Sequence, residues 1–138
     1  MADTFDSGKH GAIIAIAFGA ANLTTGESNT DLTLEQSTLA VMPAAGSVIG
    51  VSIRSSAIAT GGTITAKPHK ASTEYADAST PAPVLTTAAQ SSYATARPGA
   101  LTFDAGDTLG VSVTTTTTLQ PTNTLDVDAV LFVQLDPS

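Results

Sequence analysis

The chain has 138 residues, of which 12% are charged, and 5 Lys and Arg against 12 Asp and Glu give a formal net charge of -7. This length is typical of one domain, and the composition excludes both a highly charged disordered chain and a coiled coil. The negative charge argues against nucleic acid as a partner, because a duplex carries a phosphate charge about every 1.7 Å. The absence of cysteine excludes disulfides and thiolate metal ligands.

The N-terminal segment differs in character from the rest of the chain. Residues 1–10 are polar and lack periodicity, which predicts a flexible N-terminal arm, and residues 11–138 are then expected to form a single domain. The longest apolar run, 11–21, is shorter than the roughly 18 residues of a transmembrane helix, so we expect no membrane partner. Asp3 and Asp6 make the segment before this run acidic, whereas a secretion signal is positively charged there.

Alternation of apolar and polar residues dominates the chain and predicts half-buried strands joined by turns. The pattern is clearest at 46–54, at 109–114 and in the last strand. In that last strand, apolar residues at 130–133 fall on both faces, which predicts that it is central or covered on its second face. In chain order, strands are expected at 12–18, 31–34, 38–42, 46–54, 63–67, 84–88, 100–103, 109–114 and 126–135.

Gly, Pro, Asn and Asp separate these strands, and their spacing predicts an all-β fold, an antiparallel two-sheet, jelly-roll-like sandwich of about 8 strands. No segment favours a long helix, and 71–78 allows either one helical turn or a loop within a long exposed connection, 67–83. Aromatic residues are only 4% and Ala and Thr are abundant, so each buried side chain contributes little hydrophobic free energy to the core. We therefore expect association with other chains, the alternative being a well-packed monomer.

The chemistry-bearing residues do not form a recognisable catalytic or cofactor motif, and we expect a protein without enzymatic activity or cofactor. His10 and His69 are far apart, without metal-ligand spacing, and are predicted to be solvated. No Gly-x-Ser-x-Gly elbow or phosphate-binding loop is present. The five threonines at 114–118 favour a half-exposed strand over ice or glycan binding.

Two pairs of carboxylates are the candidate ion ligands. Asp104 and Asp107 flank Gly106, which favours a tight turn, with a calcium site as the alternative. Asp126 and Asp128 share one face of the last predicted strand. Calcium needs six to eight oxygen ligands, and whether either pair binds an ion stays open.

Three stretches carry a resemblance to a known group of proteins. Residues 43–52 read Pro-Ala-Ala-Gly followed by an apolar-Gly-apolar strand, and 101–113 read Phe-x-x-Gly-Asp followed by a second such strand. The chain closes with an acidic and apolar strand at 125–133. Over about 40–135 the chain resembles small jelly-roll modules of tailed-virus particles, which include capsid decoration (cement) proteins, head fibres and fibre heads.

This resemblance implies a structural viral protein of a bacteriophage, a homotrimer that decorates the outer capsid surface of the virion after synthesis in the host cytoplasm. Its partners are then other copies of itself and the major capsid protein. The motifs are strand and turn signatures, so no functional residue carries over from the family. We expect the N-terminal arm to bind the shell, with Phe5 as an apolar anchor and Lys9 and His10 as polar contacts.

A second hypothesis belongs to a different class. The chain is then a carbohydrate- or receptor-binding head of a viral fibre or of a bacterial surface protein. Tyr75 and Tyr93 are the candidate ligand-binding residues, because an aromatic ring can stack on the apolar face of a sugar.

Overall fold

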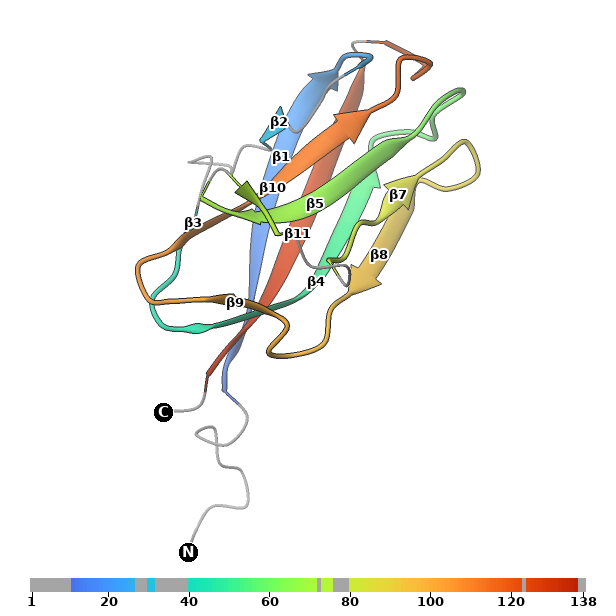
Figure 1. Ribbon diagram of the computed structural model, residues 1–138. Coiled ribbons are helices and arrows are strands. Elements are labelled where there is room, and N and C mark those ends of the chain that lie inside the picture. The colour runs from blue at the N-terminus through green and yellow to red at the C-terminus, as the bar shows by residue number, and fades with distance from the viewer. Residues whose placement is uncertain are drawn as a thin grey trace, which may run out of the picture.

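The computed structural model describes residues 11–26, 30–31, 40–71, 73–75, 80–122 and 124–136 (Figure 1). Within these ranges the regular structure consists of strands, and no helix there is long and apolar enough to cross a membrane. The strands are β1 (Ile13–Leu23), β2 (Thr30–Asp31), β3 (Ala40–Val41), β4 (Gly46–Ser55), β5 (Ile64–Lys70), β6 (Thr73–Glu74), β7 (Val84–Leu85), β8 (Ser91–Thr95), β9 (Leu101–Phe103), β10 (Thr108–Thr115) and β11 (Leu125–Leu135).

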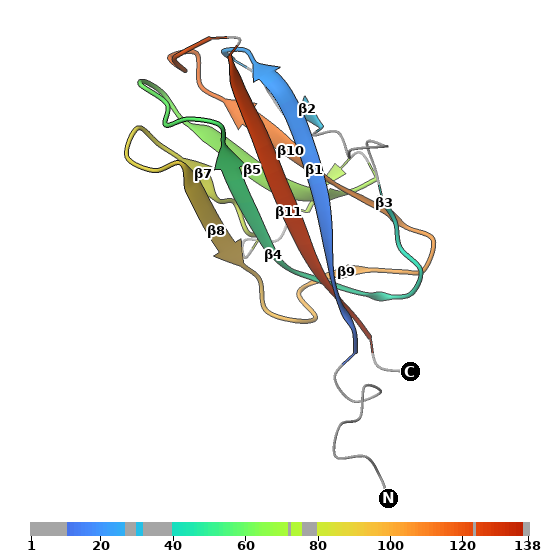
Figure 2. The ribbon, with the colours of Figure 1, turned by 180° about the vertical axis from the view of Figure 1, so that it is seen from behind.

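The strands form two sheets that face each other. The five-stranded sheet has the order β1-β11-β4-β8, with β9 also paired to β4. The six-stranded sheet has the order β2-β10-β5-β6, with β3 paired to β10 and β7 paired to β5. All these pairings are antiparallel. Seen from behind, β1, β11, β4 and β8 lie side by side in front of the second layer (Figure 2). The predicted antiparallel, jelly-roll-like sandwich is confirmed.

The core lies between the two sheets and follows from the alternation along each strand. Successive side chains of a strand point to opposite faces, so every second residue can be buried. On β10, Leu109, Val111 and Val113 have no exposed surface, and β11 buries every second residue from Leu125 to Val133 in the same way. Other large side chains that are 2% exposed or less come from the remaining strands and one loop: Phe18, Leu23, Ile53, Ile64, Leu85, Leu101, Phe103 and Leu119.

The predicted strands differ from the observed ones mainly in extent. The three clearest predictions correspond to β4, β10 and β11, and β11 is central, between β1 and β4. β1 and β5 run further than predicted, whereas β7 is shorter. β6 and β8 were not predicted, since neither shows alternation of strongly apolar residues. Of the strands expected at 31–34 and 38–42, residues 32–39 lie outside the described residues.

One expectation for polar residues was wrong, and a second holds only for Thr114 and Thr115, which belong to β10. His69 was predicted to be solvated, but it lies in β5 with 2% of its surface exposed, because β5 continues its pairing with β10 up to Lys70. The His69 Nδ1 lies 2.6 Å from the carbonyl oxygen of Ala71. The threonine run does not form one strand face, since β10 ends at Thr115 and the Thr116 hydroxyl instead accepts a hydrogen bond from the backbone of the neighbouring loop.

Candidate functional site

The side chains of the five-stranded sheet that point away from the core form a surface that we call the outer face. Residues directly opposite each other in an antiparallel pair lie on the same face, so the pairing aligns these side chains in rows across β1, β11, β4 and β8. The first row is Ala15, Phe132, Gly50 and Thr95; the second is Ala17, Val130, Ser52 and Tyr93; the third is Gly19, Asp128, Arg54 and Ser91. The first two rows are uncharged, and the third carries one charge of each sign.

An aromatic pair spans the first two rows. The ring of Tyr93 is 6.0 Å from that of Phe132, centroid to centroid, and the planes meet at 84°, an edge-to-face contact. Gly50 lies on the strand between them, and a Cβ there would be 3.0 Å from the Tyr93 hydroxyl and 3.3 Å from its ring. Glycine at this position therefore lets the tyrosine ring lie across β4. Tyr93 is still 59% exposed, so most of its ring is available to another molecule.

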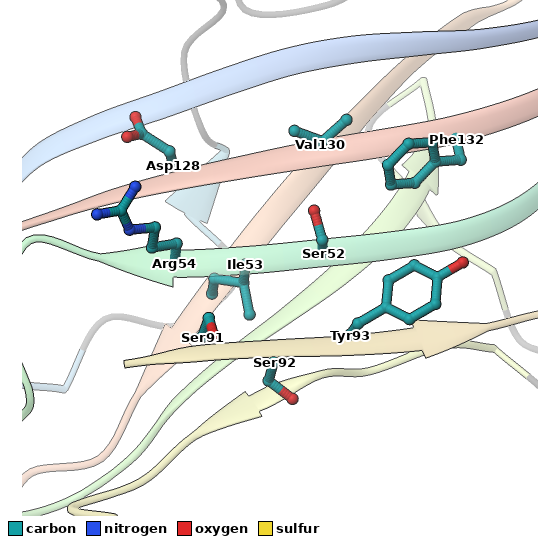
Figure 3. A pocket seen from close by; sticks show the side chains of 9 residues that line it. All are labelled: Ser52, Ile53, Arg54, Ser91, Ser92, Tyr93, Asp128, Val130 and Phe132. Atoms are coloured by element: carbon teal, nitrogen blue, oxygen red, sulfur yellow. The ribbon is translucent and has the colours of Figure 1, made fainter. Parts of the chain in front are cut away.

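Beside this pair the outer face is hollowed into an open trough with a volume of about 800 Å³. Figure 3 shows its side chains coming from β4, β8 and β11. Val130 and Phe132 of β11 provide apolar surface, and the small Ser52 of β4 lies between them and Tyr93. The residues that line the trough are Ser52, Ile53, Arg54, Ser91, Ser92, Tyr93, Asp128, Val130 and Phe132.

Charged groups border the trough at the third row. Asp128 and Arg54 are direct cross-strand partners, and both are exposed. Asp126, two residues before Asp128 on the same face of β11, accepts a hydrogen bond from the Asn22 backbone at 3.0 Å. The outer face therefore combines an uncharged region with a border that offers both hydrogen-bond donors and acceptors.

The structure separates the two tyrosines that the sequence singled out. Tyr93 lies in the trough, whereas Tyr75 follows β6 of the other sheet and packs against the core. The Tyr75 hydroxyl donates a hydrogen bond to the Thr102 carbonyl at 3.1 Å, and burial, together with the charge of Asp107, raises its pKa to about 12. Tyr75 is thus engaged within the fold. The predicted shell contacts Phe5, Lys9 and His10 lie outside the described residues.

The carboxylates at 104–107 make the turn that their spacing indicated. The backbone N–H of Asp104 donates to the Asp107 carboxylate at 2.8 Å, and Gly106 has a φ of +87°, where glycine is favoured. The Gly106 N–H also donates to the Met42 carbonyl at 2.8 Å, which fastens the turn to the chain before β4. In the part of the chain that the structure describes, no group of three or more His, Cys, Asp or Glu gathers as a metal site.

The sequence pointed to one part of the outer face and missed the rest. Apolar residues on both faces at 130–133 were the signal for Val130 and Phe132, which are partly exposed. Arg54, Ala15 and Ala17 were not identified as candidate residues. The signal available for the two alanines was the alternation of Ile and Ala along β1, which places small apolar side chains on its exposed side.

Fold and site together define a protein of the antiparallel β-sandwich class with a partly apolar, uncovered sheet face. No protein-family model and no curated protein matches the sequence. Among solved structures, the chain is similar to one in the cyanophage Pam1 capsid asymmetric unit, with 19% identity, a TM-score of 0.49, and coverage of 91% of this chain and 86% of that one.

Two further solved structures are similar over most of both chains. A chain of the acid-stable capsid of Helicobacter pylori bacteriophage KHP30 is 14% identical, with a TM-score of 0.49 and coverage of 94% and 91%. A chain of Turnip Yellow Mosaic Virus is 13% identical, with a TM-score of 0.41 and coverage of 93% and 95%.

Proposed function

We propose that this chain is a non-enzymatic structural protein of a bacteriophage particle, a homotrimeric decoration module that binds the outer surface of the capsid. The observation that carries the proposal is the outer face, where the first two rows are uncharged and Tyr93 and Phe132 are left available in a single chain. Apolar surface that one chain leaves uncovered is typical of proteins that assemble with others.

The motifs behind the family resemblance have a structural place in the sandwich. Residues 43–52 lead into and form part of β4, and 101–113 comprise β9, the Gly106 turn and most of β10. Residues 125–133 belong to β11, at the centre of the five-stranded sheet. These elements build both layers of the sandwich, so the resemblance concerns its framework and supports the proposed class of protein.

In this role the protein would stabilise the shell by mass action, since a ligand that binds only the assembled particle shifts the equilibrium toward it. A trimer has the closed symmetry needed to match three-fold positions on a capsid. In the proposed mechanism the N-terminal arm contacts the major capsid protein, with Phe5 as anchor and Lys9 and His10 as polar contacts. The protein would then be found on the outer surface of the virion.

Light scattering and co-sedimentation test this proposal together. The purified chain is expected at three times 13.8 kDa, and it should sediment with empty capsids assembled from the major capsid protein of the same genome. Deleting residues 1–10 should weaken sedimentation with capsids and leave the trimer folded. A full-length chain that stays in the supernatant contradicts the decoration role, and an arm-deleted chain that sediments to the same extent as the full-length chain removes the arm from the mechanism.

A second candidate function is a carbohydrate- or receptor-binding head, which the trough specifically favours. Tyr93 offers an exposed ring for stacking on a sugar, and Arg54, Asp128 and Ser91 can exchange hydrogen bonds with hydroxyl groups. A glycan array tests this role with Tyr93→Ala, which should abolish binding, and Tyr75→Ala as control, because Tyr75 is engaged within the fold. Absence of binding by the unmodified chain, or equal binding by both variants, argues against a sugar site at the trough.

A further inference from the structure

The uncharged part of the outer face extends well beyond the trough. On β1, Ala15 and Ala17 are exposed and lie opposite Phe132 and Val130 of β11. Ile13, further along the same side of β1, is 63% exposed. An apolar surface therefore continues from the aromatic pair across β11 to the edge of the sheet, in a chain whose net charge is -7.

That edge is itself available for association. β1 is 11 residues long and pairs with β11 on one side, and within the described ranges no strand pairs with its other side. A long apolar edge strand exposes unpaired backbone groups and favours contact with another chain, so natural proteins usually cover or protect it. The edge and the outer face are continuous through Ile13, Ala15 and Ala17.

We propose that the outer face of the five-stranded sheet is the surface through which copies of this chain bind one another, with Phe132 on the inner strand β11 and Tyr93 on β8 as its aromatic contacts. This assignment rests on the proposed homotrimer and specifies its interface. The occupant of the trough is then a second copy of this chain.

The size of the outer face fits such a contact. β1 and β11 have 11 residues each, β4 has 10 and β8 has 5, so at about 3.3 Å per residue and about 4.8 Å between neighbouring strands the projected area is about 600 Å². This area is at the lower end of the roughly 600 to 1,000 Å² per partner that a specific interface buries. Tyr and Arg are enriched among the residues that contribute most binding energy at interfaces, and the outer face carries Tyr93 and Arg54.

The charges on the outer face also favour a second copy. Copies with a net charge of -7 repel each other on average, so contact is favoured where the surface is uncharged or carries both signs. The outer face meets both conditions, because its first two rows are uncharged and its third row places Arg54 beside Asp128, with Asp126 further along the same face of β11. A sugar in the trough would leave the apolar surface of β1 uncovered, whereas a second copy covers both.

The experiment places a charge on the face without touching the core. Ala17→Arg inserts a guanidinium on an exposed position of β1, and Ala105→Arg makes the same change in the exposed turn between β9 and β10. Light scattering should show Ala17→Arg at 13.8 kDa, one third of the wild-type mass, with Ala105→Arg unchanged. Far-UV circular dichroism verifies that each variant is folded. Thr95→Arg on β8 is a second variant of the outer face, and it should also be monomeric.

Nitration of tyrosine with tetranitromethane gives an independent measurement. The chain has two tyrosines, and Tyr75 should react slowly in every variant because its hydroxyl is hydrogen-bonded and partly buried. Tyr93 should be protected in the wild-type assembly and should react several-fold faster in Ala17→Arg. Equal reactivity of Tyr93 in both proteins contradicts its position inside the interface.

The outcomes separate this inference from the proposed function. A wild-type trimer with Ala17→Arg also trimeric overturns the assigned interface and leaves the homotrimer standing. If Ala17→Arg is still trimeric but no longer sediments with capsids, the outer face contacts the shell, and the assigned interface between copies is overturned. A monomeric variant supports the interface, and if the trimeric wild type then fails to sediment with capsids, the decoration role alone is lost. A wild-type monomer overturns both.

Discussion

Substitution of Gly62 by alanine gives a sharp test of how the loops at one end of the sandwich pack. Gly62 has a φ of +73°, and a Cβ there would lie 2.6 Å from the Leu119 backbone nitrogen and 2.5 Å from the Thr116 hydroxyl. The loop between β4 and β5 therefore contacts the loop between β10 and β11 closely at this point. Gly99 is the matched control, because its φ is +87° and a Cβ there would meet nothing within 4 Å.

The two variants differ in the crowding they create. Both introduce a left-handed backbone conformation for an L-residue, which costs about 1 to 2 kcal/mol. Gly62→Ala also forces a methyl group against backbone atoms, and such overpacking costs about 1 to 3 kcal/mol more. We therefore expect Gly62→Ala to lower the free energy of unfolding by about 2 to 5 kcal/mol and Gly99→Ala by about 1 to 2 kcal/mol.

Urea unfolding followed by far-UV circular dichroism measures both changes. All proteins are compared at one chain concentration, because assembly makes apparent stability depend on concentration. In thermal unfolding, each kcal/mol corresponds to roughly 3 °C for a chain of 138 residues, so the two midpoints should differ by several degrees. Equal destabilisation by the two substitutions refutes the close contact between Gly62 and Leu119.

Three further predictions concern the core, Tyr75 and a hydrogen bond between two loops. Leu131→Ala removes a side chain with no exposed surface and should lower the free energy of unfolding by about 2 to 5 kcal/mol, and a urea midpoint near that of the wild type contradicts its central position. The pKa of Tyr75 is raised from 10.0 to about 12, so its neutral form is favoured in the folded state, and its contribution to stability is complete below pH 10 and lost as the pH rises through about 12. Tyr75→Phe should flatten this alkaline decline in stability, and an unchanged profile assigns the decline to other groups. Thr116→Val removes the hydroxyl that accepts a hydrogen bond from the Thr63 N–H at 3.0 Å, and should lower the free energy of unfolding by about 1 kcal/mol in the same urea assay. An unchanged urea midpoint contradicts a stabilising role for this hydrogen bond.

A strand could be predicted from the sequence wherever one of its faces packs against the core and the other faces solvent. In β4, in β10 and in β11 up to Ala129, apolar residues alternate with small or polar ones, and a period of two follows directly from strand geometry. β8 gave no such signal, because Ser91, Tyr93 and Thr95 point away from the core and Ser92 and Ala94 are small. Burial of His69 was also not predictable, because it depends on how far β5 pairs with β10.

The candidate site was only partly visible in the sequence for a similar reason. Tyr93 and the second apolar side of the last strand were recognised as residue types and as a pattern. Their meeting was not, since Phe132 lies beside Gly50 and Ala15 only through pairings between strands far apart along the chain. Alternation tells which residues share a face of one strand, but it carries no information about which strands are neighbours.

The amino-acid order by itself determined that this polypeptide forms strands and turns and that these assemble into an antiparallel sandwich, because side-chain alternation and turn preferences act over a few adjacent residues. The tertiary structure decided which strands adjoin, in what register, and hence that an aromatic pair, a trough and a mixed-charge border share one uncovered surface. That decision depends on hydrogen bonding and packing between distant segments, which no local pattern records.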